Sequence, residues 1–184
     1  MRRFALACAA LLLLSACQTR PQPIEPTAAA SARPAPASAT KGSTVEPPGL
    51  PVITKRNDAT GAANFVLYWV KVSNYAALTG DTELLREISA PACEGCRRYI
   101  ELYEKTYADG GYFRGGAQKL KSVEYQKGAR EHFFFCELLM APGTFRRSRS
   151  SEPAITKGET SNVVFAVSRV GDSWIVTQIG PDPQ

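Results

Sequence analysis

Residues 132–140 read HFFFCELLM and carry the clearest strand signal in the chain. Alternate residues place one apolar set on one face of the strand, namely Phe134, Cys136, Leu138 and Met140. The opposite face also carries apolar side chains, namely Phe133, Phe135 and Leu139. The sequence therefore predicts a strand that is central in its sheet or covered on both sides.

Weaker strand signals lie on either side of this stretch. Val123 and Tyr125 alternate with polar residues before it, and Val163, Phe165 and Val167 alternate after it. A last strand is expected around Trp174. These patterns predict about four antiparallel strands in the C-terminal half.

Helical spacing dominates the residues before the strands. A first helix is predicted over about 60–78, capped by Asp58 or Thr60 and ended by Gly80, with an apolar face of Phe65, Tyr68, Trp69, Val72 and Ala76. A short second helix is expected over about 82–89. Ser89 and Pro91 then predict the start of a third helix, which the glycines at 110 and 111 end.

Helices followed by antiparallel strands indicate an α+β roll. About three N-terminal helices should pack on the concave face of a curved antiparallel sheet of about four strands. Residues 58–184 are enough for one domain with one core.

The N-terminus resembles a lipoprotein signal peptide over residues 1–16. Arg2 and Arg3 precede an apolar run that is too short for a membrane span of roughly 20 residues. Residues 14–17 read LSAC, which resembles the bacterial lipobox, so we expect a diacylglycerol with fatty acyl chains such as palmitate on Cys17. The expected location is the extracytoplasmic face of the cell membrane. An ordinary secretory signal with a chance cysteine remains the alternative.

Residues 17–57 are predicted to form the lipidated end and a tether. Positions 18–57 hold eight of the 13 prolines and almost no apolar periodicity. Such a segment buries too little apolar surface to offset the entropy of ordering, so we expect disorder. The tether is interpreted as a spacer, and a linker of no selected length is the alternative.

The net charge of +5 belongs to the N-terminal segments. Residues 58–184 hold 15 basic and 15 acidic residues, so the domain itself is neutral. A nucleic-acid partner would require a basic domain surface and is not expected.

Cys93 and Cys96 carry the sharpest chemistry. Residues three apart in a helix lie within the distance that a disulfide spans, and thiols oxidise outside the membrane, so a structural disulfide is predicted. The alternative is a thiol–disulfide oxidoreductase, since a helix N-terminus favours a thiolate at Cys93. The β-α-β context and the Trp that accompany thioredoxin-like sites are missing. Cys136 is interpreted as a buried small hydrophobe, and a bridge to Cys93 or Cys96 is its alternative.

Other polar residues predict no catalytic site. No metal and no cofactor are expected, since His132 is the only histidine and two cysteines do not complete a zinc site. His132 is interpreted as a surface residue, with a general base in a pocket as the alternative. The Arg146–Arg149 stretch is interpreted as a hairpin loop that could touch anionic lipid or wall polymers, and 109–116 as a flexible connection.

Six aromatic residues of the helices fit either the core or a ligand cavity. They are Tyr68, Trp69, Tyr75, Tyr99, Tyr103 and Tyr107. At helical spacing aromatic residues are most often core, but a cavity between helices and sheet would favour binding of a small molecule or peptide.

The element order resembles the NTF2-like (cystatin-like) superfamily of cone-shaped α+β domains. More narrowly, the chain is similar to an uncharacterised family of actinobacterial surface lipoproteins. The residues that carry this similarity are Cys17, the Pro/Ala tether, the 63–69 stretch ANFVLYW, the 79–82 turn TGDT and the 93–96 motif CEGC. The resemblance implies the location and the fold, and it implies no activity.

The expected function is therefore a non-catalytic binding or accessory domain of the cell envelope, anchored to the membrane through Cys17. Its partner would be an envelope protein, a peptide or a small ligand. The alternatives are an oxidoreductase that uses Cys93 and Cys96, or a pocket enzyme of NTF2-like type.

Overall fold

The computed structural model describes residues 45–183. Along these residues the helices are a short 3-10 helix η1 (Val52–Lys55) and the α-helices α1 (Ala59–Thr79), α2 (Glu83–Glu87) and α3 (Glu94–Ala108). The strands are β1 (Gly110–Gly115), β2 (Gln118–Lys127), β3 (His132–Met140), β4 (Gly143–Ser148), β5 (Ala154–Thr156), β6 (Glu159–Val170) and β7 (Ser173–Pro181).

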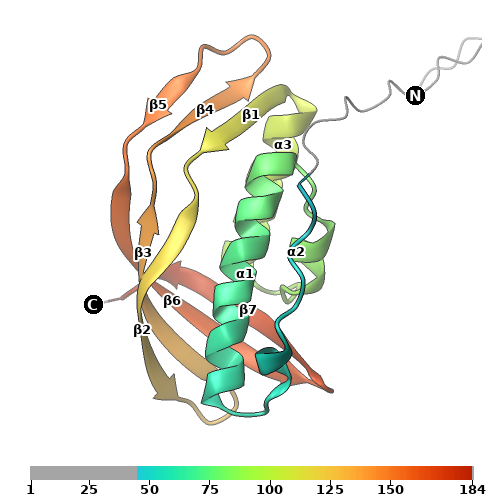
Figure 1. Cartoon of the computed structure of the whole chain (residues 1–184), viewed down its shortest axis with the longest axis vertical. Helices are drawn as coiled ribbons and strands as arrows, with labels where there is room; N and C mark the ends of the chain where they lie inside the picture. Colours follow the sequence, from blue (N-terminus) through green and yellow to red (C-terminus); the bar gives the residue numbers. More distant parts are fainter. Residues whose placement is uncertain (1–44, 184) are drawn as a thin grey trace, which may run out of the picture. The chain divides into compact units, whose positions relative to one another are not determined.

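The strands form two antiparallel sheets (Figure 1). One has four strands in the order β2-β3-β6-β7, and the other has three in the order β1-β4-β5. The predicted α+β roll and its four-stranded antiparallel sheet are confirmed. The three-stranded sheet was not predicted.

The first helix has the expected ends. The Asp58 carboxylate accepts a hydrogen bond from the backbone N–H of Gly61 at 2.9 Å, which satisfies one free donor of the first turn. Gly80 ends α1 with φ of 79°, a left-handed conformation that glycine adopts without strain. The prediction of 60–78 is therefore confirmed to within one residue at each end.

The third helix begins later than predicted. Ser89 and Pro91 do not open it, because the backbone at 88–90 is bonded to β7. Ala90 N–H donates to Val176 O at 2.8 Å and Val176 N–H donates to Ile88 O at 3.0 Å. The Ser89 hydroxyl donates to Leu85 O and accepts from Trp69 Nε1, so it caps nothing. Cys93 is the actual N-cap of α3.

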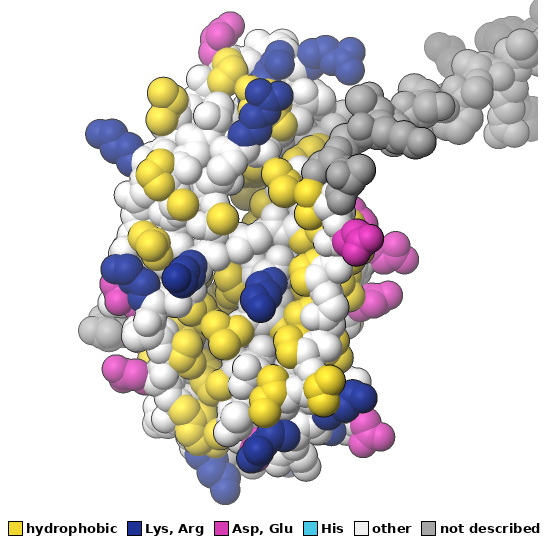
Figure 2. Space-filling view, in the orientation of Figure 1, with side chains coloured by type: hydrophobic (Ala, Val, Ile, Leu, Met, Phe, Trp, Pro, Cys, Tyr) yellow, Lys and Arg dark blue, Asp and Glu magenta, His cyan; other side chains and the backbone are white. Residues whose placement is uncertain are grey.

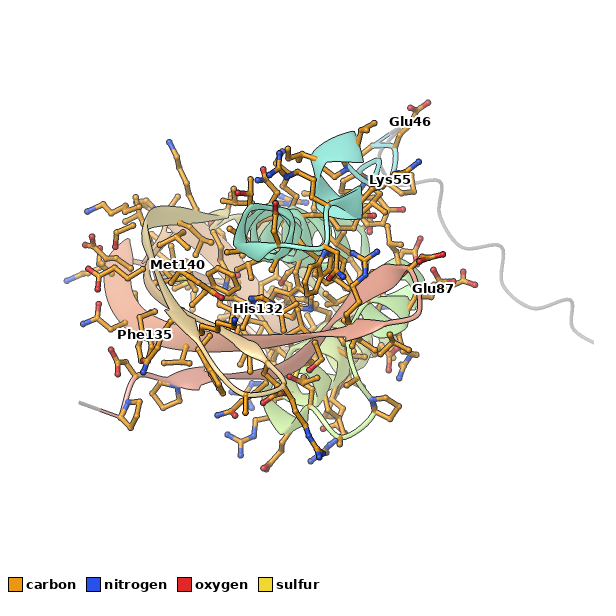
Figure 3. The ribbon with its side chains drawn as sticks, turned by 90° about the horizontal axis from the view of Figure 1, so that it is seen from below. Glu46, Lys55, Glu87, His132, Phe135 and Met140 are labelled. Atoms are coloured by element: carbon orange, nitrogen blue, oxygen red, sulfur yellow. A yellow bond between two sulfur atoms is a disulfide. The ribbon has the colours of Figure 1, made fainter. Side chains whose placement is uncertain are left out.

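The core lies between the helices and the inner face of the four-stranded sheet. β3 lies between β2 and β6, as its two-sided apolar pattern predicted. Phe134 is fully buried on the inner face, and the Trp69 ring of α1 meets Phe165 edge-on with centroids 5.5 Å apart. In Figure 3 the labelled Phe135 lies on the outer side of the sheet, away from α1, whereas Met140 lies on the side of α1.

Two stretches interpreted as loops are strands of the second sheet. Residues 110–115 form β1 instead of a flexible connection, and Arg146 and Arg147 lie within β4 instead of a hairpin tip. Gly111 lies so close to β4 that an added Cβ would stand 2.2 Å from Arg146 O. The glycines therefore permit close strand pairing here, a role that is easily mistaken for flexibility.

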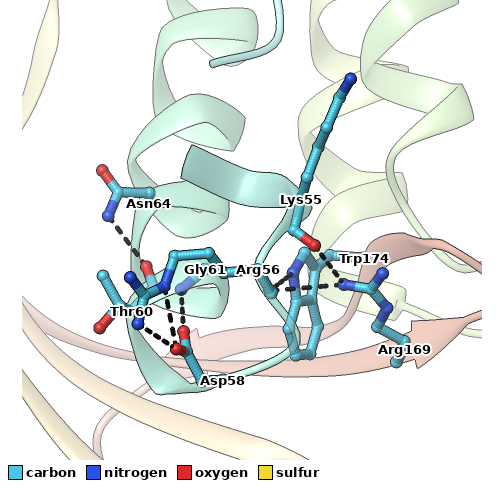
Figure 4. Close-up of polar contacts among 8 residues, drawn as sticks. All are labelled: Lys55, Arg56, Asp58, Thr60, Gly61, Asn64, Arg169 and Trp174. Carbon is cyan, nitrogen blue, oxygen red and sulfur yellow. Dashed lines mark hydrogen bonds and ion pairs between the residues drawn. The ribbon is translucent and has the colours of Figure 1, made fainter. Parts of the chain in front are cut away.

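Part of the expected tether contacts the domain. The sequence placed the domain boundary at residue 58, but residues 45–57 already lie against α1 and the β6–β7 hairpin. The Tyr68 hydroxyl donates to Pro48 O at 3.1 Å, and Trp174 Nε1 donates to Arg56 O at 3.2 Å. Arg169 also reaches the carbonyl oxygens of Lys55 and Arg56, as Figure 4 shows.

Candidate ligand cavity between α3 and the two sheets

A cavity of about 340 Å³ lies between α3 and the two sheets. Residues of α1, α3 and strands of both sheets line it, beside the Gly115–Gly116 turn that joins the sheets. Its apolar lining comprises Leu102, Tyr103, Phe113, Leu138, Met140 and Phe145. Figure 2 shows a hollow with hydrophobic side chains between α1 and the β1–β2 side of the molecule. The volume falls within the range of about 300–1,000 Å³ that is typical of small-molecule sites.

An aromatic series forms one wall of the cavity. Phe113 of β1 stacks on Phe145 of β4 with centroids 4.8 Å apart, and it meets Tyr103 of α3 edge-on at 5.5 Å. Tyr99 continues the series on α3, 6.1 Å from Tyr103. Edge-on and stacked rings attract one another through their quadrupoles, so this wall is a defined surface for apolar or aromatic groups.

The Tyr103 hydroxyl is held inside the protein. It shares a hydrogen bond of 3.0 Å with the buried Ser73 hydroxyl of α1. Burial raises the pKa of the Tyr103 phenol well above its ordinary value, so the group stays neutral even at an alkaline pH at which a free tyrosine ionises. The wall therefore carries no charge from this side chain.

Asn74 ties α1 to the first residue of β2 at the cavity. Its side chain donates to Gln118 O at 2.8 Å and accepts from the Gln118 backbone N–H at 2.8 Å. The same amide group thus satisfies both backbone groups of one strand residue. This pair of bonds fixes the position of Gln118 on the cavity wall.

The side chain of Gln118 is less well satisfied than its backbone. Its Nε2 donates to the Tyr99 hydroxyl over a long 3.4 Å. Its Oε1 is buried and has no hydrogen-bond partner among the described residues. A buried amide atom without a partner destabilises the fold by about 1–3 kcal/mol, so the packing of the domain does not explain this polar group.

Comparison with known families places the chain. The profile of DUF6318, described as a family of unknown function, matches residues 33–179. The chain belongs to DUF6318. No curated protein matches the sequence of this DUF6318 chain significantly.

Solved structures similar to this DUF6318 chain share its fold at low identity. The intermembrane space region of the chloroplast protein ARC6 has a TM-score of 0.51 and 16% identity, over 68% of this chain and 97% of that one. An NTF2-like protein with a cystatin-like fold from Novosphingobium aromaticivorans has a TM-score of 0.39 and 15% identity, over 67% and 88%. An uncharacterised cystatin-like protein from Caulobacter vibrioides has a TM-score of 0.42 and 11% identity, over 64% and 85%. Two of these similar structures are described as NTF2-like or cystatin-like, the superfamily that the element order resembles.

Cys93 and Cys96 form a disulfide at the start of α3, with Cα atoms 5.3 Å apart. Both residues are buried, with 1% and 0% of their surface exposed. A thiol–disulfide oxidoreductase must present a sulfur to the thiolate of its partner. The burial of both sulfurs favours the structural interpretation over the redox alternative.

Cys136 and His132, the other two candidate site residues, do not line the cavity. Cys136 is a buried free thiol, as predicted, and burial raises its pKa to about 12. His132 is half-buried and not a plain surface residue. Its ring stacks on Tyr125 and meets Trp174 edge-on, and Nδ1 lies 3.0 Å from the Tyr125 hydroxyl. The described contacts give His132 no carboxylate partner.

The six predicted aromatic residues divide between cavity and core. Tyr99 and Tyr103 line the cavity, and Tyr75 lines an adjoining hollow. Tyr68 and Trp69 are buried in the core, and Tyr107 donates to the carbonyl oxygens that end α1. Sequence reasoning missed Phe113, Phe145 and Gln118. The aromatic character of Phe113 and Phe145, in or next to stretches interpreted as loops, was the available signal for this part of the cavity.

The predicted signal peptide, Cys17 and most of the predicted tether lie outside the described residues. Within residues 45–183, no cluster of three potential metal ligands occurs. No described helix is both long and apolar enough to cross a membrane.

Proposed function

We propose that this protein is a non-catalytic binding module of the cell envelope, which takes a small apolar molecule or an apolar peptide side chain into the cavity beside α3. The cavity itself carries the proposal. It is partly open to solvent, and apolar and aromatic residues from both sheets and two helices form most of its exposed lining. The fold alone would not decide the function, because NTF2-like domains include enzymes and binding proteins.

The chemistry of the lining favours binding over catalysis. Its titratable residues are Tyr99, Tyr103, Arg114 and Glu159. A tyrosine such as Tyr103 is neutral at physiological pH, and Arg114 and Glu159 are exposed, with the Arg114 guanidinium over Tyr112. No nucleophile of this lining is hydrogen-bonded to a base, which nucleophilic and acid–base mechanisms require. The lining instead offers apolar contact and one amide for orientation.

The anchor belongs to the same proposal. Arg2 and Arg3, the short apolar run and the LSAC sequence at 14–17 favour a diacylated Cys17 at the outer face of the membrane. Two acyl chains on one residue would give stable attachment, whereas one chain binds reversibly. The proline-rich residues 18–44 would then set the largest distance of the domain from the membrane.

Naphthalene is a suitable probe of the cavity, because an apolar cavity of about 150 Å³ already accepts benzene. Titration of residues 18–184, which contain every described residue, should give saturable NMR shifts at the methyl groups of Leu138 and Met140. Ala77→Phe places a ring into the cavity and should abolish these shifts. Leu67→Phe, an exposed position on the same helix, is the control and should leave them unchanged. Absence of saturable binding, or equal binding by Ala77→Phe, would contradict the proposal.

The anchor has a separate test. Cys17→Ala should move the protein from the membrane fraction to a soluble or mislocalised one, while Cys8→Ala, within the signal peptide, should not. Unchanged membrane fractionation of Cys17→Ala would refute lipidation and leave the cavity proposal standing.

A further inference from the structure

The outer face of the three-stranded sheet has a different character from its inner face. Phe113 and Phe145 pair across β1 and β4 on the inner side, where they reach Tyr103 of α3. Since strand residues alternate between faces, their neighbours point the other way. Among the described elements, α1 and α3 are the helices that contact this sheet, and they lie on the inner side.

Strand pairing defines two rows across this outer face. Arg114 of β1 pairs with Thr144 of β4, which pairs with Ile155 of β5. In the adjacent row Tyr112 pairs with Arg146. We call these five residues the β1-β4-β5 outer face.

Ile155 is 85% exposed, more than any other large apolar side chain of the described residues. Tyr112 lies close by in the adjoining row, with the Arg114 guanidinium 4.3 Å from its ring centroid. An exposed aliphatic side chain beside a tyrosine and arginines is the composition of a membrane-interface contact, where apolar groups enter the headgroup layer and cations meet phosphates.

Charge is concentrated in the same part of the domain. Residues 109–116 and 141–158 hold five basic residues and two acidic ones, a net charge of +3. Because residues 58–184 are neutral overall, the rest of the domain carries a net charge of −3. Figure 2 shows Lys and Arg side chains over the end of the molecule that contains β4 and β5, and further ones over its middle and its other end. Arg146 hydrogen-bonds to the carbonyl oxygens of Arg149 and Ser151, which fixes its position without neutralising its charge.

We propose that the β1-β4-β5 outer face docks on an anionic phospholipid surface. Ile155 and the Tyr112 ring enter the headgroup layer, and Arg114, Arg146 and the adjacent Arg149 meet lipid phosphates. The described chain also starts near this sheet, since Val45 and Glu46 line a hollow with Gly115 and Gly116. The proposed docking of this face depends neither on the cavity nor on acylation of Cys17.

Vesicle co-sedimentation of residues 18–184, which lack the lipidated cysteine, tests this docking. At low salt, binding to vesicles of phosphatidylcholine with phosphatidylglycerol should exceed binding to pure phosphatidylcholine by on the order of 100-fold, since each net positive charge contributes roughly fivefold. Added salt should remove most of the difference.

Two variants and a matched control locate the contact. Combined R114Q, R146Q and R149Q should abolish the preference for anionic vesicles, and Ile155→Glu should weaken binding about tenfold or more. The control, combined K119Q, K127Q and R130Q, removes the same charge from exposed positions of β2 and the turn after it and should retain the preference. Circular dichroism confirms folding of each variant. Equal loss in the control, equal binding to neutral vesicles, or retention by a soluble polyphosphate polymer without vesicle binding would overturn the proposal.

Discussion

Gly95, in the first turn of α3, lies directly against the backbone of Ile179 in β7. A Cβ atom on Gly95 would stand 1.9 Å from the Ile179 carbonyl oxygen and 2.7 Å from its side chain. The adjacent Cys93 and Cys96 are buried and bonded to each other, while Glu94 is exposed and paired with Arg98. The CEGC motif is thus explained by packing, because it docks the start of α3 on the sheet.

Gly95→Ala should destabilise the domain by about 1–3 kcal/mol, since backbone must move to admit the methyl group. The change in melting temperature and the urea midpoint measure this effect. Gly180→Ala is the control, because nothing lies within 4 Å of a Cβ at that position, only one residue from Ile179. Equal stability of the two variants would show that α3 does not pack this closely.

The disulfide should stabilise the fold without being essential to it. The bridge closes a loop with a sequence separation of only 3, for which loop-closure entropy predicts about 2 kcal/mol. Cys93→Ala with Cys96→Ala should therefore lower the melting temperature and leave a folded domain. In the native protein the buried bridge should resist mild reductant, as alkylation and mass spectrometry would show. Rapid reduction in the native state would restore the oxidoreductase alternative.

Asn74→Ala should destabilise the domain, because both backbone groups of Gln118 would lose their partners. The expected loss is about 1–3 kcal/mol by urea unfolding. Asn64→Ala is the matched control on α1, since Asn64 makes one exposed hydrogen bond to Thr60 O and should cost little. The two variants should differ clearly, and equal stability would mean that the Asn74 bonds are not formed.

Gln118→Met separates the role of the side chain from that of the backbone. The Asn74 bonds use only the Gln118 backbone, so they persist in this variant. Removal of the unpartnered Oε1 should leave stability unchanged or raise it by up to about 1 kcal/mol. A marked loss of stability would show that the amide has a structural partner in solution.

The sequence predicted those elements whose local signal agrees with their tertiary role. Asp58 and Gly80 bound α1 as expected, and the two-sided apolar pattern of residues 132–140 predicted a central strand. The predicted start of α3 was wrong, because Ser89 and Pro91 form a good local helix signal that the fold does not use. Hydrogen bonds from 88–90 to β7, which no local pattern reveals, decide that backbone instead.

The cavity was foreseen only in part for the same reason. Tyr99 and Tyr103 lie on a helix whose periodicity is visible in the sequence. Phe113 and Phe145 lie on short strands that contain glycine, a residue of low strand propensity. These strands pair with each other, outside the four-stranded sheet. The orphan amide of Gln118 depends on the contact between α1 and β2 and could not be found from the sequence.

The buried thiol of Cys136 should make the domain less stable at alkaline pH. Burial raises its pKa from 9.0 to about 12, so the folded state keeps the proton that the unfolded chain loses. The contribution of Cys136 to stability is therefore fully present below about pH 9 and is lost as the pH rises toward about 12. Cys136→Val should flatten the fall in the free energy of unfolding over this range. Val163→Ala, at the position paired with Cys136, should lower stability at every pH and keep the slope. An unchanged slope in Cys136→Val, or rapid reaction of the native thiol with alkylating reagent, would show that Cys136 is accessible to solvent.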